Sequence, residues 1–161
     1  RLKKDNNCEI VSLHIRRGDL TDGSCIGTNI FYGPKDILTE DSVYGRYLKK
    51  AKNIFHNKKV KFLIFSGGSR NGDYNTSDLD WCKKNFTGNE YLFSEDKNTM
   101  EDFSLLKSCD HNIACHMTSF GWWAAYLNNN KNKVVVAPKH YDITDQTLVR
   151  KDFYPPDWKL V

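Results

Sequence analysis

The segment His14-Ile15-Arg16-Arg17-Gly18-Asp19 holds the residues most suited to chemistry, and it stands at the end of a β-rich run. Two adjacent arginines in such a place are costly to bury without anions, so they indicate either a ligand with several negative charges or a network of carboxylates. The planar guanidinium fork suits the oxygens of a diphosphate, and Gly18 permits close approach of the backbone. A surface salt-bridge cluster around Asp19 explains the same residues, and spacing does not decide between the two interpretations.

Two places further along the chain could bind the same ligand. Thr118 and Ser119 stand where a helix is predicted to begin, and hydroxyl groups with free backbone amides at a helix N-terminus make an anion site. An N-cap by either residue explains them equally well. Asp102 stands where a capping-box acid is expected in a helix that begins at Thr99. Its carboxylate could instead accept two hydrogen bonds, from N1–H and the exocyclic amine of guanine.

Other conspicuous residues have simpler structural interpretations. The loop at residues 66–73 lacks the dinucleotide fingerprint and the P-loop, so an ordinary tight turn is expected there. Asp78 and Asp80 open a predicted helix and complement its dipole. None of the five cysteines forms a C-x-x-C pair, so no metal site is expected. We interpret as structural two lone histidines and the tryptophan pair of a helix expected to be buried: His111, His116, Trp122 and Trp123.

The elements that must position these residues alternate between strand and helix. We expect strands at residues 9–15, 60–65, 91–93, 111–115 and 133–138, and helices at 42–56, 77–86, 99–109 and 119–127. Such alternation predicts an α/β fold, a Rossmann-like parallel sheet flanked by helices, in a single domain over residues 1–161. A ligand then binds at the carboxyl ends of the strands, where residues 14–19, 66–68 and 116–119 fall. The tail from Asp142 is expected to be irregular and to pack by Phe153, Tyr154 and Trp158.

Composition narrows the classes of function. A net charge of +4 suits a partner that carries phosphates but is too small for a nucleic-acid-binding surface. No run approaches the roughly 20 apolar residues that span a bilayer, so a membrane anchor would lie outside this chain. Two glycosylation sequons, at Asn75 and Asn85, tilt the case slightly toward a secretory compartment, and a disulfide involving Cys8 or Cys25 is possible.

Taken together, the motifs stand in one order that is more specific than any one of them. The order resembles that of the α-1,2-fucosyltransferases of glycosyltransferase family 11, from about Val11 to Pro138. The resemblance is carried by His14-x-Arg16-Arg17-Gly18-Asp19, Trp81-Cys82-Lys83, Glu101-Asp102-x-x-Leu105-Leu106-x-Ser108-Cys109, His111-Asn112-Ile113-Ala114, Thr118-Ser119-Phe120-Gly121-Trp122-Trp123-Ala124-Ala125-Tyr126-Leu127 and Val136-Ala137-Pro138.

This resemblance implies one half of a GT-B-type glycosyltransferase, the C-terminal half, which holds GDP-fucose. Carried over residue by residue, it implies His14 near guanine and Arg16 and Arg17 on the diphosphate. The same resemblance implies Asp102 as the reader of guanine, with Thr118 and Ser119 near the β-phosphate. The common Asn-Ser-Ser-Phe form is replaced here by residues 116–120, His-Met-Thr-Ser-Phe, so the local phosphate contacts stay open.

The reaction implied is transfer of L-fucose from GDP-fucose to a hydroxyl of a galactose-containing glycan, with inversion and formation of an α-1,2 linkage. Arg16 or Arg17 would stabilise the charge on the departing GDP, so no metal or other cofactor is expected. Asp19 could act as the general base or could hold an arginine in place, and we favour the holding role. For a eukaryotic source, the resemblance implies the luminal side of the Golgi membrane.

Two alternatives belong to other classes of function. One is a non-catalytic GDP-sugar-binding module related to fucosyltransferases. The other is an unrelated α/β carbohydrate-binding or interaction domain, which requires the order of the motifs to be a coincidence.

Overall fold

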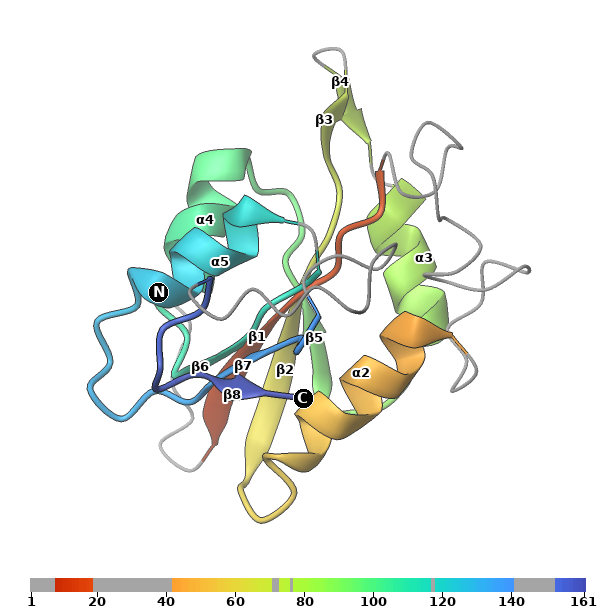
Figure 1. Ribbon diagram of the computed structural model, residues 1–161. Helices are drawn as coiled ribbons and strands as arrows, with labels where there is room; N and C mark the ends of the chain where they lie inside the picture. The colour runs from red at the N-terminus through yellow and green to blue at the C-terminus, as the bar shows by residue number, and fades with distance from the viewer. Residues whose placement is uncertain (1–7, 19–41, 71–72, 76, 117, 141–152) are drawn as a thin grey trace.

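A six-stranded parallel sheet forms the centre of the protein, as the computed structural model in Figure 1 shows. The structure describes residues 8–18, 42–70, 73–75, 77–116, 118–140 and 153–161. The strands lie in the order β5-β2-β1-β6-β7-β8. Their bounds are Glu9–His14 for β1, Val60–Phe65 for β2, Tyr91–Phe93 for β5, His111–Ile113 for β6, Val135–Ala137 for β7 and Lys159–Leu160 for β8.

The strand order places a topological switch point between β1 and β6. From β1 the chain adds β2 and then β5 on one side, and it then adds β6, β7 and β8 on the other. Leu13 of β1 accordingly pairs with Ile64 on one side and with Ile113 on the other. In open α/β sheets a ligand binds at such a point, outside the carboxyl ends of the strands.

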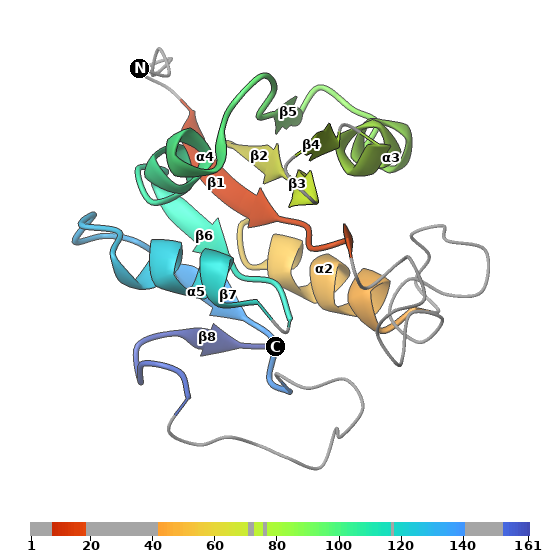
Figure 2. The same cartoon turned by 90° about the horizontal axis from the view of Figure 1, so that it is seen from above.

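Helices cover both faces of the sheet (Figure 2). α2 (Val43–Asn53) and α3 (Ser77–Asn85) lie on one face, whereas α4 (Thr99–Leu106) and α5 (Ser119–Tyr126) lie on the other. Successive side chains of β1 point to opposite faces of the sheet, so this strand contributes to the hydrophobic cores on both faces. Val11 and Leu13 pack with the aromatic residues of α2, whereas Ile10 packs with the cluster of Leu106 and Ala124. The predicted α/β class, a parallel sheet flanked by helices, is therefore confirmed.

Capping residues fix where the helices begin. The Ser42 hydroxyl accepts a hydrogen bond from the backbone N–H of Gly45, at 3.0 Å, at the start of α2.

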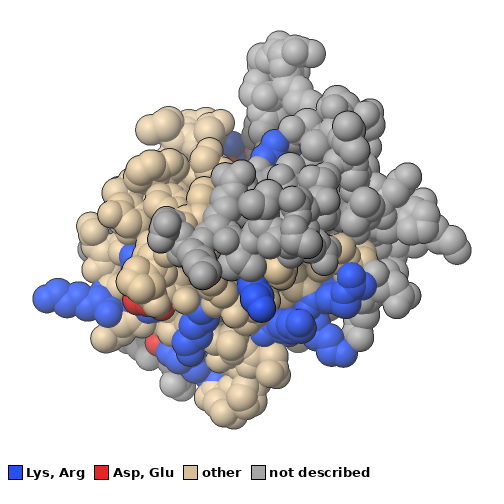
Figure 3. Space-filling model, viewed as in Figure 1, with Lys and Arg blue, Asp and Glu red and all other residues tan. Residues whose placement is uncertain are grey.

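Three residues on the outer side of α2, Arg46, Lys49 and Lys50, are exposed, and Figure 3 shows basic side chains over this helix. These basic residues lie on α2 and not at the carboxyl ends of the strands. The net charge of the chain therefore does not identify which arginines bind phosphate.

Three expectations about local structure were wrong. Residues 66–73 do not form a simple turn, because β3 (Gly68–Arg70) pairs antiparallel with β4 (Asp73–Asn75). The end of the tail, which was expected to be irregular, forms β8 and pairs with β7, although Trp158 packs against the core as expected; residues 142–152 lie outside the described residues. α5 is not a buried helix. It lies in an outer layer, and only its small residues Gly121, Ala124 and Ala125 are buried.

The two tryptophans of α5 therefore differ in their burial. The Trp122 ring packs on Trp158, with ring centroids 5.4 Å apart, whereas Trp123 is 50% exposed. The expectation that Trp123 is a core residue was wrong, because the outer side of α5 has no layer above it in the described part of the chain.

Among the described residues the cysteines form no disulfide: Cys8, Cys82, Cys109 and Cys115 are all free thiols. Cys25 lies outside the described residues. In the part of the chain that the structure describes, no helix has the length and apolar character needed to cross a membrane.

Candidate functional site

His14 ends β1 at the switch point and packs directly against α5. Its ring centroid lies 5.4 Å from that of Phe120. A Cβ atom on Gly121 would lie only 3.0 Å from His14 Nδ1, so a glycine at this position permits the close contact between strand and helix. The two motifs that contain His14 and Ser119, more than 100 residues apart in sequence, therefore meet at the carboxyl edge of the sheet.

The His14 ring is neutral and has one unmatched nitrogen. Burial, reinforced by the charge of Arg16, lowers the pKa of His14 to about 4. Nδ1 is buried and has no hydrogen-bond partner among the described residues. Because a buried N–H without an acceptor is rarer than a buried lone pair without a donor, we assign the ring proton to Nε2. His14 therefore offers a single N–H donor, on the side of the ring away from Gly121.

Arg17 points to the opposite face of the sheet and is held by α3. Its Nε donates to Asp78 Oδ1 at 3.3 Å, and its Cζ lies 3.9 Å from the ring centroid of Trp81. The next residue, Gly18, donates its backbone N–H to Asp78 Oδ2 at 3.2 Å. A carboxylate network around the arginines therefore exists, and Asp78 supplies it.

Asp78 is a residue that the sequence interpretation missed. It stands in the first turn of α3, as the predicted helix-dipole role requires, but its side chain is also buried against Arg17, which the sequence did not predict. Asp19, for which we favoured the holding role, lies outside the described residues, and both of its predicted roles stay predictions. Arg16 is half-buried between His14 and Arg17.

Asp102 does not cap α4. The N-cap is Asn98, whose side chain accepts hydrogen bonds from the backbone N–H groups of Met100 and Glu101. The capping-box acid is Glu101, whose carboxylate accepts from the Asn98 N–H at 3.0 Å. The expected capping position was wrong by one residue, because the helix takes its cap from Asn98 and its third position is then Glu101.

The Asp102 carboxylate takes no part in the capping box and is oriented by Ser94. The Ser94 hydroxyl, just after β5, donates to Asp102 Oδ1 at 2.6 Å. Asp102 Oδ2 accepts no hydrogen bond from the described residues. Burial raises the pKa of Asp102, and the hydrogen bond from Ser94 opposes that shift. Ser94 is a second residue that the sequence interpretation missed, since a lone serine after a three-residue strand carries no signal.

Thr118 occupies the N-cap position of α5 without capping it. Its backbone is extended, at φ −137° and ψ 129°, but its side chain makes no capping hydrogen bond. The N-cap interpretation therefore holds for the backbone of Thr118 and not for its hydroxyl group. Thr118 is buried and Ser119 is exposed at the start of the helix.

Aromatic rings connect the parts of the site on the α4 and α5 face. Phe120 lies 5.4 Å from His14 and 5.4 Å from Phe103, the neighbour of Asp102, between ring centroids. His14, Asp102 and the start of α5 therefore share one face, whereas Arg17 lies on the α3 side. Arg16 stands between these two groups in sequence.

A cavity of about 280 Å³ lies at the opposite edge of the sheet. Its lining includes Asp110, Asn128 and Asn130, whose polar groups are engaged in hydrogen bonds within the protein. We therefore do not assign the nucleotide to this cavity. The residues that the structure describes contain no group of three or more histidine, cysteine or acidic side chains arranged to hold a metal ion.

The fold and its switch point define a doubly wound α/β protein of the kind that binds nucleotides. Comparison with known proteins identifies the family: the model of glycosyl transferase family 11 matches residues 1–161, and the chain belongs to this family.

Relatives with assigned names include two proteins of Escherichia coli. The O-antigen biosynthesis glycosyltransferase WbnK is 27% identical over 139 residues, which cover 84% of this chain and 40% of the relative. An alpha-1,2-colitosyltransferase is 31% identical over 137 residues, covering 80% of this chain and 39% of the relative.

The human galactoside alpha-(1,2)-fucosyltransferase 1 is 30% identical over 122 residues, covering 73% of this chain and 28% of the relative. The chain thus spans two fifths or less of the length of each of these three relatives. No solved structure matches the chain significantly.

Proposed function

We propose that this chain forms the GDP-fucose-binding part of a galactoside α-1,2-fucosyltransferase. The enzyme transfers L-fucose, with inversion, to a hydroxyl of a galactose-containing glycan. Membership of glycosyl transferase family 11 supports the transferase class, and the names of the fucosyl- and colitosyltransferase relatives support the α-1,2 linkage. For a eukaryotic source we propose the luminal side of the Golgi membrane.

The observation that carries the choice of nucleotide is the state of Asp102. Its helix is already capped by Asn98 and Glu101, so the half-buried carboxylate is not needed for capping. Ser94 fixes one oxygen and leaves the other for a ligand. A carboxylate so oriented can accept hydrogen bonds from N1–H and the exocyclic amine of guanine, a pair that uracil and adenine do not offer.

The rest of the site then follows from charge and position. His14 Nε2–H donates to the nucleotide at the switch point, and Arg16 neutralises the charge that develops on the leaving diphosphate. The N-terminus of α5, with Thr118 and Ser119, faces the β-phosphate. In this proposal the arginine supplies the electrostatic stabilisation that a metal ion supplies in other transferases, and Asp19 remains a candidate for the base or for a holding role.

Isothermal titration of the chain with GDP, GDP-fucose, UDP and ADP tests the proposal. We expect binding of the two guanine nucleotides, and Asp102→Asn should weaken it by about 10- to 100-fold, the loss typical of hydrogen bonds to a charged group. Glu101→Gln is the matched control, because it removes the same charge one residue away and glutamine still serves in a capping box. Equal affinity for all four nucleotides, or equal losses in the two variants, would contradict Asp102 as the guanine reader.

A transfer assay separates the enzyme from the non-catalytic alternative. Incubation of the full-length protein with GDP-fucose and a β-galactoside should release GDP and yield a 2-O-fucosylated product, with or without a chelator. GDP binding without transfer would favour the binding module instead.

A further inference from the structure

Among the described carboxylates, only that of Asp78 has an observed contact with residues 16–18. It makes two hydrogen bonds there. Its Oδ1 accepts from Arg17 Nε at 3.3 Å, and its Oδ2 accepts from the backbone N–H of Gly18 at 3.2 Å. One carboxylate therefore fixes both a side chain and the peptide that follows it. Gly18 has φ +53°, a left-handed conformation that glycine adopts without strain.

Trp81 adds a third constraint from the same helix. It stands three residues after Asp78, and positions i and i+3 of a helix lie on one face. The Arg17 guanidinium lies over its ring, with Cζ 3.9 Å from the centroid. Stacking of this kind uses the face of the guanidinium and leaves its in-plane N–H groups to oxygen acceptors.

The helix that carries both residues is anchored in the core. Leu79, Cys82 and Phe86 are buried, and the last two belong to the cluster formed with β1 and α2. Arg17 and Asp78 are each only 7% exposed. A buried ion pair of this kind contributes little net stability compared with apolar residues, so its effect is better sought in what it positions.

We propose that Asp78 and Trp81 are positioning residues of the donor site. They hold Arg17 and the Gly18 turn against α3, and they thereby orient Arg16, the preceding residue, toward the diphosphate. Arg17 acts through this clamp, whereas direct contact with the leaving phosphate falls to Arg16. This inference rests on the proposed function, because it takes GDP-fucose as the ligand, and it divides the roles of two arginines that the sequence treats alike.

Asp78→Asn and Asp80→Asn make a matched pair of variants for the test. Both residues stand in the first turn of α3, and both changes remove one negative charge there, but Asp80 is exposed. The readout is the affinity for GDP and for guanosine, which lacks the phosphates, each measured below the unfolding onset of the variant. We expect Asp78→Asn to weaken GDP by about tenfold, as is common for residues that orient a ligating group, and to leave guanosine unchanged. Asp80→Asn should change neither.

Further variants separate positioning from simple loss of structure. Trp81→Phe keeps a ring under the guanidinium and should retain most of the GDP affinity, whereas Trp81→Leu should not. Arg17→Lys combined with Asp78→Asn should lose no more affinity than either change alone, because both break the same clamp.

Equal effects of Asp78→Asn and Asp80→Asn on GDP would overturn the clamp alone, as would parallel losses of GDP and guanosine affinity. A parent chain that binds neither GDP nor GDP-fucose would overturn the proposed function, and the clamp with it.

Discussion

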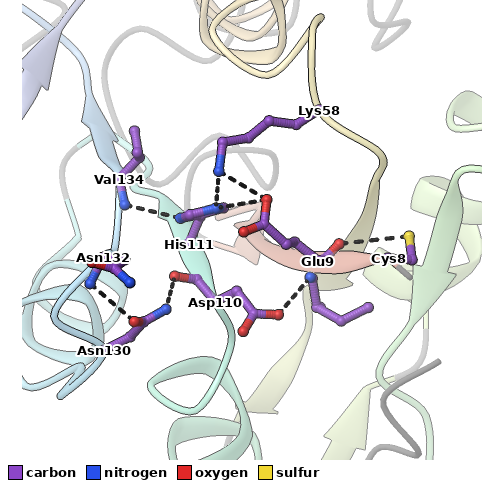
Figure 4. A network of polar contacts seen from close by, with 9 residues as sticks. Cys8, Glu9, Lys58, Asp110, His111, Asn130, Asn132 and Val134 are labelled. Atoms are coloured by element: carbon purple, nitrogen blue, oxygen red, sulfur yellow. Dashed lines mark hydrogen bonds and ion pairs between the residues drawn. The ribbon is translucent and has the colours of Figure 1, made fainter. Parts of the chain in front are cut away.

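The two edges of the parallel sheet treat their polar side chains in opposite ways. At the amino edge, shown in Figure 4, His111 Nδ1 accepts from the Val134 N–H at 2.9 Å, while the Lys58 ammonium donates to Glu9 at 2.8 Å and lies 3.1 Å from His111 Nε2. Each of these groups has a partner within the protein. The lowered pKa of His111, caused mainly by burial, keeps the ring neutral and able to accept from Val134.

Buried amides complete this edge. Asn112 donates to Ser12 Oγ at 2.7 Å, and Asn128 donates to Asn112 Oδ1 at 2.7 Å. Lys133 donates to three carbonyl groups at the end of α5, those of Ala125, Tyr126 and Asn128. These bonds satisfy the C-terminus of the helix without a ligand.

At the carboxyl edge, by contrast, some hydrogen-bonding groups of the described side chains are not used within the fold. Asp102 has one oxygen without a hydrogen bond from the described residues, and the Thr118 hydroxyl does not cap its helix. Since buried polar groups in native proteins are generally paired, groups that the fold leaves unpaired are candidates for binding a ligand. One edge therefore uses its polar groups within the fold, whereas the other has polar groups that, in the function proposed above, bind the nucleotide.

Replacement of Asn112 by alanine should have the largest effect on stability. The change leaves one N–H of the Asn128 amide and the Leu106 carbonyl without the partner that Asn112 supplies, and each unsatisfied buried group costs about 1–3 kcal/mol. We expect a loss of about 3 kcal/mol in the free energy of unfolding, measured by urea denaturation. GDP affinity of the folded fraction should stay unchanged. A stable variant with weakened GDP binding would break the division between the edges.

Acid should weaken the fold through histidines that burial keeps neutral. Burial, with a smaller contribution from the charge of His140, lowers the pKa of His116 to about 3 from its usual 6.5. A group with a depressed folded-state pKa contributes stability fully above its unfolded pKa and loses it as the pH falls from 6.5 toward 3. From pH 7.5 to pH 5 the loss from His116 alone is about 2 kcal/mol.

His116→Phe tests this expectation, because it keeps a ring beside Tyr47 and removes the titration. The free energy of unfolding of the variant should fall less between pH 7.5 and pH 5 than that of the parent. His56→Gln, at an exposed position of the same chain, is the control. An unchanged pH dependence in His116→Phe would show that His116 is not the group responsible.

Gly121→Ala should have the smallest effect and should fall on the ligand. The added Cβ would lie 3.0 Å from His14 Nδ1, so the ring must move by a few tenths of an ångström. Alanine is the better helix former by about 1 kcal/mol, which offsets the strain in the fold. We therefore expect near-parental thermal stability with GDP affinity reduced a few-fold. Unchanged affinity would argue that the orientation of His14 does not matter for binding.

The sequence predicted five of the six strands of the parallel sheet because each of the five lies in its own β-rich run. Residues 60–65 and 91–93 were expected as strands with the bounds that the structure has, and alternation with helices implied the parallel sheet. The helix at residues 119–127 was also found, but its burial was misjudged. The run from Phe120 to Leu127 has no polar period, so its pattern carries no information about which side faces the sheet.

The sequence brought His14 and Ser119 to one edge because both follow predicted strands of a parallel sheet, whose carboxyl ends meet at one edge. It did not predict which side chains pair across long separations in the chain. The pairing of Arg17 with Asp78 spans 61 residues, and a helix-dipole role explained Asp78 equally well from sequence. The role of Ser94 was hidden because it depends on where α4 is capped. Asn98 and Glu101 form the capping box, so the next residue, Asp102, accepts a hydrogen bond from Ser94 instead.

The most direct test of the central claim is a map of amide chemical-shift changes in this chain on addition of GDP. We expect changes at residues 14–18, 94–102 and 118–121, at the carboxyl edge. We expect none at residues 107–112 and 128–134, at the amino edge. Shifts confined to the amino edge, or no shifts at saturating GDP, would contradict the assignment of the carboxyl edge as the nucleotide site.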